Sequence, residues 1–198
     1  MKKLKSIIGE IDIYLIDQIL KERYTKTDKI LDAGCGSGRN LKWFYNNNYT
    51  IFGVDNNTKR LEVSKNLYPN QKENFILANV EDLPFESETY EHIICNAVLH
   101  FATSHAHFEL MFSELVRVLK TRGTIFIRMT SDIGIEKLVK LISNGVYKLP
   151  DTTERFLLTR TLLKKIMTTY KLSFLEPIKT VNVNDLRCMT TLILKKIV

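Results

Sequence analysis

The sequence predicts an α/β fold: a doubly wound, mostly parallel sheet of seven strands with helices on both faces and an antiparallel last strand. Short apolar segments alternate with amphipathic ones along nearly all of the 198 residues, which is typical of such sheets. Three glycines follow the first apolar strand segment directly. The two last apolar segments have no helical stretch between them, so we expect them to pair antiparallel at one edge.

The first half of the chain contains three expected helices. One lies near residues 10–23, where apolar residues recur at helical spacing. A second opens near Arg39 and ends at the three asparagines that follow it, and a third runs over Lys59–Leu67 behind the capping residue Thr58. The strands expected between these helices are Lys29–Ala33, Thr50–Val54, Phe75–Ala78 and Glu91–Asn96.

The second half contains the clearest helix, because five apolar residues from Phe108 to Leu119 keep helical spacing without a miss. Gly123 is expected to end this helix before a strand at Thr124–Met129. Residues 131–158 then break the alternation of strands and helices. The remaining expected elements are a short helix at Ile135–Ile142, a hairpin of Val146–Leu149 and Arg155–Leu158 about Pro150-Asp151, a helix from Thr159 to Tyr170, and strands near Leu172–Ile178 and Cys188–Leu194.

Composition excludes several classes of protein. Hydrophobic residues (44%) and charged residues (26%) have ordinary globular shares, which excludes a disordered chain, a collagen or a coiled coil. The net charge is +7, but the lysines are scattered and form no run, so no nucleic-acid-binding patch is indicated. No apolar stretch approaches the length of a membrane span, and acidic residues interrupt the apolar part of Met1–Leu20. Three separated cysteines form no disulfide framework, so we expect a soluble, cytoplasmic protein.

A glycine loop and two acids point to a ligand. Gly34, Gly36 and Gly38 lie within five residues between a strand and a helix, and such a loop lets a ligand approach the backbone N–H groups closely. Asp32 ends the strand before the loop, where a carboxylate attracts an ammonium or sulfonium group and repels a pyrophosphate. Asp55 ends the next strand, at the place where an acid accepts the hydrogens of ribose hydroxyls.

The segment after the third strand completes this set of binding groups. Residues 79–82, Asn-Val-Glu-Asp, place backbone and amide groups where they can bind an adenine edge. A cation, a ribose and an adenine together describe S-adenosylmethionine. The glycine pattern is GxGxG rather than the GxGxxG of NAD-type oxidoreductases, and no Gly-Lys-Ser/Thr of a P-loop follows it. The sequence therefore favours S-adenosylmethionine over a dinucleotide or a nucleoside triphosphate.

Longer motifs support the same ligand. The chain carries LDAGCGSGRN (residues 31–40), GVDNN (53–57), NVEDLPFESETYEHIICNAVLHF (79–101) and FSELVRVLKTRGTIFIRM (112–129). Together these segments resemble class I S-adenosylmethionine-dependent methyltransferases of the small-molecule type. The tail RCMTTLILKK (187–196) is similar to the antiparallel last strand of that fold. The resemblance implies a Rossmann-like methyltransferase fold, S-adenosyl-L-methionine as cofactor, and methyl transfer to a small-molecule acceptor.

The resemblance also implies a role for each site residue. Asn79 stands where the family often has Asp, so an acceptor for the adenine amino group is kept without its charge. The implied contacts are the methionine ammonium at Asp32, the backbone beneath the methionine at Gly34, Gly36 and Gly38, the ribose at Asp55, the adenine at Asn56, Asn79 and Val80, and the methionine end at the backbone of Asn96.

His100 is the candidate general base, because it follows the fourth strand close to where the transferred methyl group would lie. A position in the pocket wall is the alternative for this histidine. His105 and His107 have metal-like spacing, but no third ligand accompanies them, so no metal site is predicted. Methyl transfer needs proximity, alignment and exclusion of water more than a catalytic triad, because the sulfonium is already reactive.

An RNA or protein methyltransferase and a non-catalytic S-adenosylmethionine-binding protein are the alternative functions. Amino-methylating enzymes of nucleic acids carry Asn/Asp-Pro-Pro-aromatic after the fourth strand, whereas this chain has Asn96-Ala97-Val98-Leu99. Cys95 lacks the preceding proline of a cytosine-C5 nucleophile, and no appended basic module is visible. A nucleic-acid partner is therefore not expected.

We expect one domain, a monomer or homodimer, with four parts. They are an N-terminal helical cap (1–27), a cofactor-binding core (28–130), an insertion or lid (131–158), and a C-terminal helix with a strand pair (159–198). In the family that the chain resembles, the cap and the insertions after strands four and five select the acceptor. We expect residues 131–158 to cover the acceptor rather than the cofactor, with a dimer contact or plain surface packing as the alternative.

Overall fold

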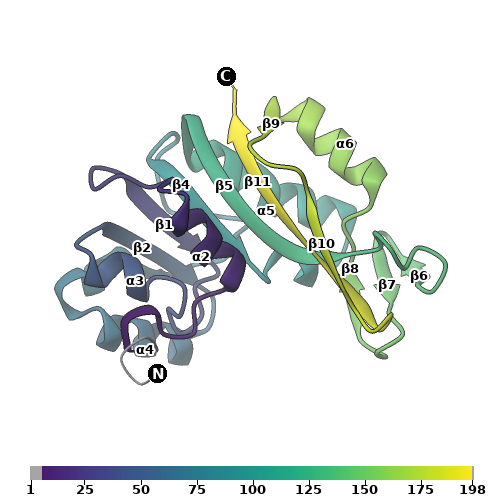
Figure 1. The fold of residues 1–198 in the computed structure, drawn as a ribbon, viewed down its shortest axis with the longest axis horizontal. Helices are drawn as coiled ribbons and strands as arrows, with labels where there is room; N and C mark the ends of the chain where they lie inside the picture. Colours follow the sequence, from purple (N-terminus) through teal and green to yellow (C-terminus); the bar gives the residue numbers. More distant parts are fainter. Residues whose placement is uncertain (1–5, 198) are drawn as a thin grey trace.

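Most of the strands form one large twisted sheet, seen in a computed structural model that describes residues 6–197 (Figure 1). The sheet order is β10-β11-β5-β4-β1-β2-β3, and β9 pairs with the other end of β11. Strands β1 to β5 are parallel, while β11 runs antiparallel to β5 and to both of its other neighbours. The strand bounds are β1 (Lys29–Ala33), β2 (Thr50–Asp55), β3 (Phe75–Leu77), β4 (Tyr90–Asn96), β5 (Leu119–Ser131), β9 (Leu172–Phe174), β10 (Lys179–Val183) and β11 (Arg187–Lys196). The predicted doubly wound, mostly parallel sheet with an antiparallel last strand is confirmed, but among the described residues it has eight strands rather than the expected seven.

Helices cover both faces of this sheet. On one face α2, α3 and α4 pack on a cluster that includes Leu15, Phe44 and Ile94, and on the other α5 and α6 pack around Phe108 and Phe112. Figure 1 shows α2 in front of the central strands and α5 behind them. The helix bounds are α2 (Ile13–Leu20), α3 (Lys42–Asn46), α4 (Thr58–Leu67), α5 (His105–Val118) and α6 (Arg160–Thr169), with 3₁₀ turns η1 (Pro69–Asn74) and η2 (Leu99–Phe101).

Several helix boundaries differ from the prediction. The helix expected near residues 10–23 spans only Ile13–Leu20, and the cap of α4 is Asn57 rather than Thr58. The helix expected to open near Arg39 begins only at Lys42, because the chain first makes a turn in which Leu41 N–H donates to the Gly38 carbonyl at 3.0 Å. The helix expected to end at Gly123 ends at Val118, and β5 follows without a gap. Gly123 instead lies inside β5, where a Cβ atom would stand 2.8 Å from the Glu91 carbonyl oxygen.

Residues 131–158 contain a second, three-stranded sheet. The hairpin predicted about Pro150-Asp151 is confirmed as β7 (Val146–Lys148) paired antiparallel with β8 (Glu154–Phe156). The helix predicted at Ile135–Ile142 is wrong, because this stretch forms turns and then β6 (Lys140–Ser143), which pairs with β7. Ile135 is buried, but Leu138, Leu141 and Ile142 are exposed, so no continuous packing surface favours a helix over this stretch.

The C-terminal strands are more divided than predicted. The strand expected near Leu172–Ile178 stops at Phe174, and β10 was missed. Both pair antiparallel with β11, β9 along one end and β10 along the other. The last strand therefore lies inside the sheet, between β5 and this split edge, rather than at the edge itself.

Candidate active site

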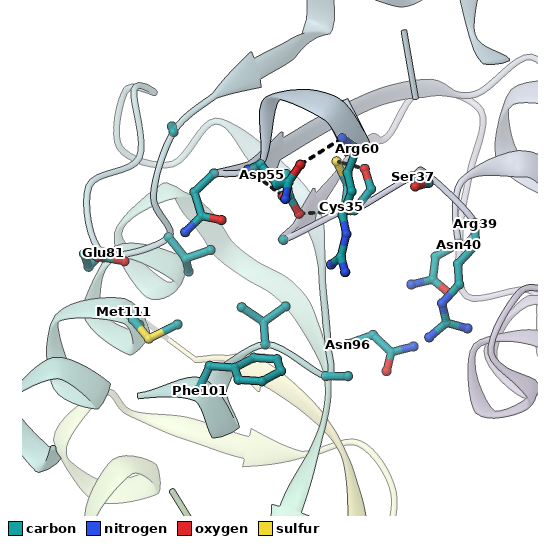
Figure 2. Close-up of a pocket in the computed structure, with 18 of the residues that line it drawn as sticks. Cys35, Ser37, Arg39, Asn40, Asp55, Arg60, Glu81, Asn96, Phe101 and Met111 are labelled. Carbon is teal, nitrogen blue, oxygen red and sulfur yellow. Dashed lines mark hydrogen bonds between the residues drawn. The ribbon is translucent and has the colours of Figure 1, made fainter. Parts of the chain in front are cut away.

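A cavity of about 700 Å³ opens at the carboxyl ends of β1, β2, β3 and β4 (Figure 2). Ligands gather at this edge of open α/β sheets. Its walls come from the glycine loop, the loops after the next three strands, and the first turns of α5. The lining residues are Gly34, Cys35, Gly36, Ser37, Arg39, Asn40, Asp55, Asn56, Asn57, Arg60, Ala78, Val80, Glu81, Asn96, Ala97, Val98, Phe101, His107 and Met111.

The glycine loop needs glycine at its first turn. Gly34 has φ +79°, and a Cβ atom there would stand 2.4 Å from a methyl carbon of Val98. The amides of Gly34 and Cys35 both donate to the Val54 carbonyl at 2.8 Å, which ties the loop to the end of β2. A turn rather than a helix follows the loop. The loop residues Gly34 to Ser37 line the cavity.

Asp55 connects the loop to the second strand. Its Oδ2 accepts a hydrogen bond from the Gly36 amide at 2.7 Å, and its Oδ1 accepts one from the Asn57 amide at 2.9 Å (Figure 2). Each carboxylate oxygen has a second lone pair, and the residue lines the cavity. Asp55 is therefore held rigidly and still has acceptor capacity for hydroxyl hydrogens.

Asp32 has the opposite environment. Its side chain is fully buried beneath the glycine loop, and neither carboxylate oxygen finds a hydrogen-bond partner among residues 6–197. Burial raises the pKa of this carboxyl to about 7, against a weaker lowering by Arg39 and Asn40. A carboxylate kept in this position is stabilised by any cation that reaches it.

Asn96 repeats this pattern at the end of β4. The residue is only 6% exposed and lines the cavity, and both side-chain polar atoms are unpartnered within the described part of the chain. Figure 2 shows the side chain extended toward the side of the cavity that holds Arg39 and Asn40. Asn96 thus presents both ends of its amide to the cavity, whereas Asp32, like Gly38, does not line it, and the Asp32 carboxylate lies buried behind the lining.

The opposite end of the cavity is more open. Asn56 and Asn79 are exposed, and the Asn56 amide donates to Asn79 Oδ1 at 3.2 Å. Val80 is buried and lines the cavity, whereas Asn79 itself does not contribute to the lining. Glu81 and His107 face each other at the rim, with 3.5 Å between Glu81 Oε1 and His107 Nε2.

His100 lies next to the cavity without lining it. Its Nδ1 accepts a long hydrogen bond from the Thr130 amide at 3.4 Å, and its ring packs edge-on against Phe101, which does line the cavity. Burial, together with the charges of Arg155 and Arg128, lowers the pKa of His100 to about 4. A neutral imidazole whose Nδ1 accepts carries its hydrogen on Nε2, so neither nitrogen is free to take a proton without a change of partner.

The comparisons agree with this geometry. The profile of a family described as "Methyltransferase domain" matches residues 31–127, the span that contains every wall of the cavity. A structure of a SAM-dependent methyltransferase from Methanosarcina mazei superposes with a TM-score of 0.70 over 91% of this chain and 97% of its own, at 18% identity. Residues 31–127 of this chain therefore carry a methyltransferase domain.

Curated relatives match part of this chain. An uncharacterized protein of Methanocaldococcus jannaschii, MJ0638, is 32% identical over 64% of this chain and 52% of its own. The uncharacterized methyltransferase YodH of Bacillus subtilis is 32% identical over 56% of this chain and 44% of its own. The chain thus spans about half the length of the curated relatives it matches.

Sequence reasoning missed part of the lining of the methyltransferase cavity. Arg39, Arg60, Glu81 and His107 supply charged or polar groups, and Met111 supplies an apolar one. Arg39 directly follows the third glycine and Glu81 lies in the segment after β3, so both were visible signals, whereas Arg60, His107 and Met111 reach the cavity only through the packing of α4 and α5. His105 does not join His107 at the cavity, and the described residues hold no group of three or more side chains placed to bind a metal. Over the same residues, no helix is long and apolar enough to cross a membrane.

Proposed function

We propose that the cavity binds S-adenosyl-L-methionine and that the domain transfers its methyl group to a small-molecule acceptor. The observation that carries this proposal is the Asp32 carboxylate, fully buried and unpartnered among the described residues, beneath the glycine loop and near an acid that ends β2. Burial of a lone carboxylate costs several kcal/mol in the absence of a counter-charge, on the order given for buried ions. A cationic ligand offsets that cost, and a pyrophosphate increases it.

The residues present fit each part of this cofactor. Asp32 would hold the ammonium, and Gly34, Gly36 and Gly38 would let the aminoacyl part pass over the backbone. Asp55 would accept from the ribose hydroxyls with the lone pairs that Gly36 and Asn57 leave free. The adenine edge would meet Asn56, Asn79 and the amide of Val80, and Asn96 would contact the methionine end.

The domain's part in the reaction is to position and enclose. S-adenosylmethionine, when bound, supplies a methyl group already activated by its sulfonium. Asn96, Val98 and Phe101 line the methionine side of the cavity and would exclude water from the reacting atoms. His100 stays neutral at pH 7 because its pKa is about 4, and it remains a proposed base only if its Nδ1 releases the Thr130 amide.

Residues 131–158 support the acceptor-lid proposal in one respect. Arg155 of β8 lies over the ring of Phe101 at 5.2 Å, which places the insertion beside the cavity mouth, while none of its residues lines the cavity itself. We propose that it forms a wall of the acceptor pocket. The three cysteines are buried and free, which supports a reducing location such as the cytoplasm.

Calorimetry with S-adenosylhomocysteine and with NAD tests the cofactor proposal. We expect S-adenosylhomocysteine to bind and NAD not to bind. Tight NAD binding with no heat from S-adenosylhomocysteine would contradict it. Labelled S-adenosylmethionine incubated with a metabolite extract, and separately with RNA and with protein, then identifies the acceptor class. Label in the small-molecule fraction supports the proposed acceptor, label in the RNA or protein fraction replaces it, and cofactor binding without label in any fraction favours a non-catalytic binding protein.

A further inference from the structure

Four polar side chains form a row across adjacent strands at the methionine end of the cavity. Asn96 of β4 stands opposite Arg128 of β5, and Arg128 stands opposite Thr191 of β11. Asp32 of β1 is level with Ile94, one pleat before Asn96 on the same face, because residues two apart point to the same side of a strand. This face is the one covered by α2, since Ile94 and Phe126 pack there with Leu15.

All four side chains of this row have polar atoms that are buried and unpartnered among residues 6–197: both oxygens of Asp32, both polar atoms of Asn96, Nε of Arg128 and Oγ1 of Thr191. Thr191 is 3% exposed. Most buried polar groups in proteins are hydrogen-bonded, so four such neighbours in one row are unusual for a purely structural sheet. They supply two anion-binding groups, a guanidinium and a hydroxyl, on the side of Asn96 away from Asp32.

The first residues of α2 and its N-cap cover this row. Asp12, the N-cap of α2, lies 3.5 Å from Arg128 Nη1, and the guanidinium of Arg128 lies over the Tyr14 ring at 5.3 Å. Two hydrogen bonds connect this covering segment to the residues that follow the glycine loop. The Asp12 amide donates to Asn40 Oδ1 at 3.3 Å, and Arg39 donates to the Glu10 carbonyl at 3.1 Å. The row thus meets the cavity at Asn96, which lines it, and continues from there beneath the start of α2.

We propose that this row is the acceptor subsite and that it recognises a carboxylate of the methyl acceptor through Arg128, with Thr191 and Asn96 as further hydrogen-bond donors. The proposal rests on the proposed function. A guanidinium binds a carboxylate through parallel N–H donors, and the loose contact with Asp12 leaves its Nε free. The charges that face the row are Asp12, Asp32, Arg39 and Arg128, which sum to zero. S-adenosylmethionine would add an ammonium, a carboxylate and a sulfonium, a net charge of +1 that one acceptor carboxylate balances. Arg128 also contributes to the low pKa of His100, which agrees with a positive field here.

Two carboxylates compete as the partner of Arg128, because the cofactor carries a carboxylate of its own besides that of the acceptor. Nitrogen NMR of the arginine Nε–H groups distinguishes them. The wild-type protein is titrated with acetate and with its neutral match acetamide, both free and saturated with S-adenosylhomocysteine, and the Arg128 signal is assigned by its loss in Arg128→Lys. We expect acetate, but not acetamide, to shift this signal saturably in the S-adenosylhomocysteine complex.

Thermal melts of the same complex provide a matched readout. Acetate is expected to raise the Tm of the wild type and of Arg122→Gln, which removes an exposed charge from the same strand, but not that of Arg128→Gln. An acetate shift seen only without S-adenosylhomocysteine would assign Arg128 to the cofactor's carboxylate and overturn the proposal. An absent shift in a formed complex, or an equal shift with acetamide, would also overturn it. If S-adenosylhomocysteine gives no heat in calorimetry, the proposed function is contradicted. The failure of the cofactor proposal is therefore distinguishable from the failure of the acceptor-subsite proposal.

Discussion

The two ends of the cavity, proposed to hold the ribose and the methionine of the cofactor, are built in opposite ways. At the ribose end, both oxygens of Asp55 already accept backbone amides of the loops they join. At the methionine end, Asp32 and Asn96 are buried deeper, and their polar atoms lack partners in residues 6–197. One end is complete before a ligand arrives, and the other becomes complete only with one.

This difference separates two contributions to ligand binding. A preorganised acid such as Asp55 gives modest affinity, and the structure of the loops also depends on it. A buried, unpartnered acid such as Asp32 destabilises the folded protein until a cation neutralises it. It therefore lowers the stability of the ligand-free protein and raises its affinity for a cationic ligand. Substitutions at the two acids should therefore change stability in opposite directions.

The largest effect is expected at Asp32. Asp32→Asn should weaken S-adenosylhomocysteine by about 2–4 kcal/mol, roughly thirty- to a thousandfold, because a buried counter-charge is lost. The same variant should raise the free energy of unfolding of the ligand-free protein at pH 8, by about 1–3 kcal/mol, because an isosteric neutral group replaces a buried charge. Calorimetry and chemical denaturation measure both quantities. A variant that binds as tightly as the wild type would remove Asp32 from the site.

Asp55→Ala should have a smaller effect on affinity and the reverse effect on stability. Loss of two hydroxyl hydrogen bonds to a charged acceptor weakens S-adenosylhomocysteine by about 1.5–3 kcal/mol, roughly ten- to a hundredfold. The amides of Gly36 and Asn57 lose their acceptor, so the free energy of unfolding should fall by about 1–2 kcal/mol. An unchanged dissociation constant in the folded variant would show that this acid does not contact the ribose.

The smallest effect on the cofactor is expected from the insertion. Phe156 is buried and stacks on Phe108 at 4.9 Å, so the sharpest variant keeps residues 154–158 and replaces residues 139–153 with a short Gly-Ser link. Affinity for S-adenosylhomocysteine should stay within about threefold, while methyl transfer to the acceptor falls. Loss of cofactor affinity in a variant that still folds would contradict the lid proposal.

The core of the fold was predictable because its signals are local. Each apolar strand segment of β1 to β4 is short, continuous and bounded by polar or turn residues, so its bounds agree with the prediction within one residue. β5 begins five residues before the predicted Thr124, because its first part is polar. The helix predicted at residues 135–142 is wrong because apolar residues at helical spacing can also be exposed side chains of turns and of a short strand. The division of the C-terminal edge into β9 and β10 depends on which stretch of β11 each one pairs with, and no local pattern carries that information.

The candidate site was predictable where its residues follow strand ends directly. Asp32, the glycines, Asp55, Val80 and Asn96 take their positions from a motif and the topology of parallel strands. Arg128 and Thr191 lie inside strands whose register sets their neighbours, so the sequence gives no sign that they join Asn96. The unpartnered state of Asp32 is likewise a property of packing rather than of sequence.

The pH dependence of cofactor affinity tests the central claim about Asp32 most directly. Below its pKa of about 7, Asp32 is protonated in the free protein and must release a proton to hold an ammonium, while the ammonium itself stays protonated to about pH 7.5. The association constant of S-adenosylhomocysteine should therefore fall by up to about tenfold per pH unit from pH 7 down to 5.5, and that of Asp32→Asn should stay nearly flat. Arg39 and Asp55, the other charges that act on Asp32, are unchanged in the variant and serve as an internal control. Parallel pH profiles for the two proteins would contradict the claim.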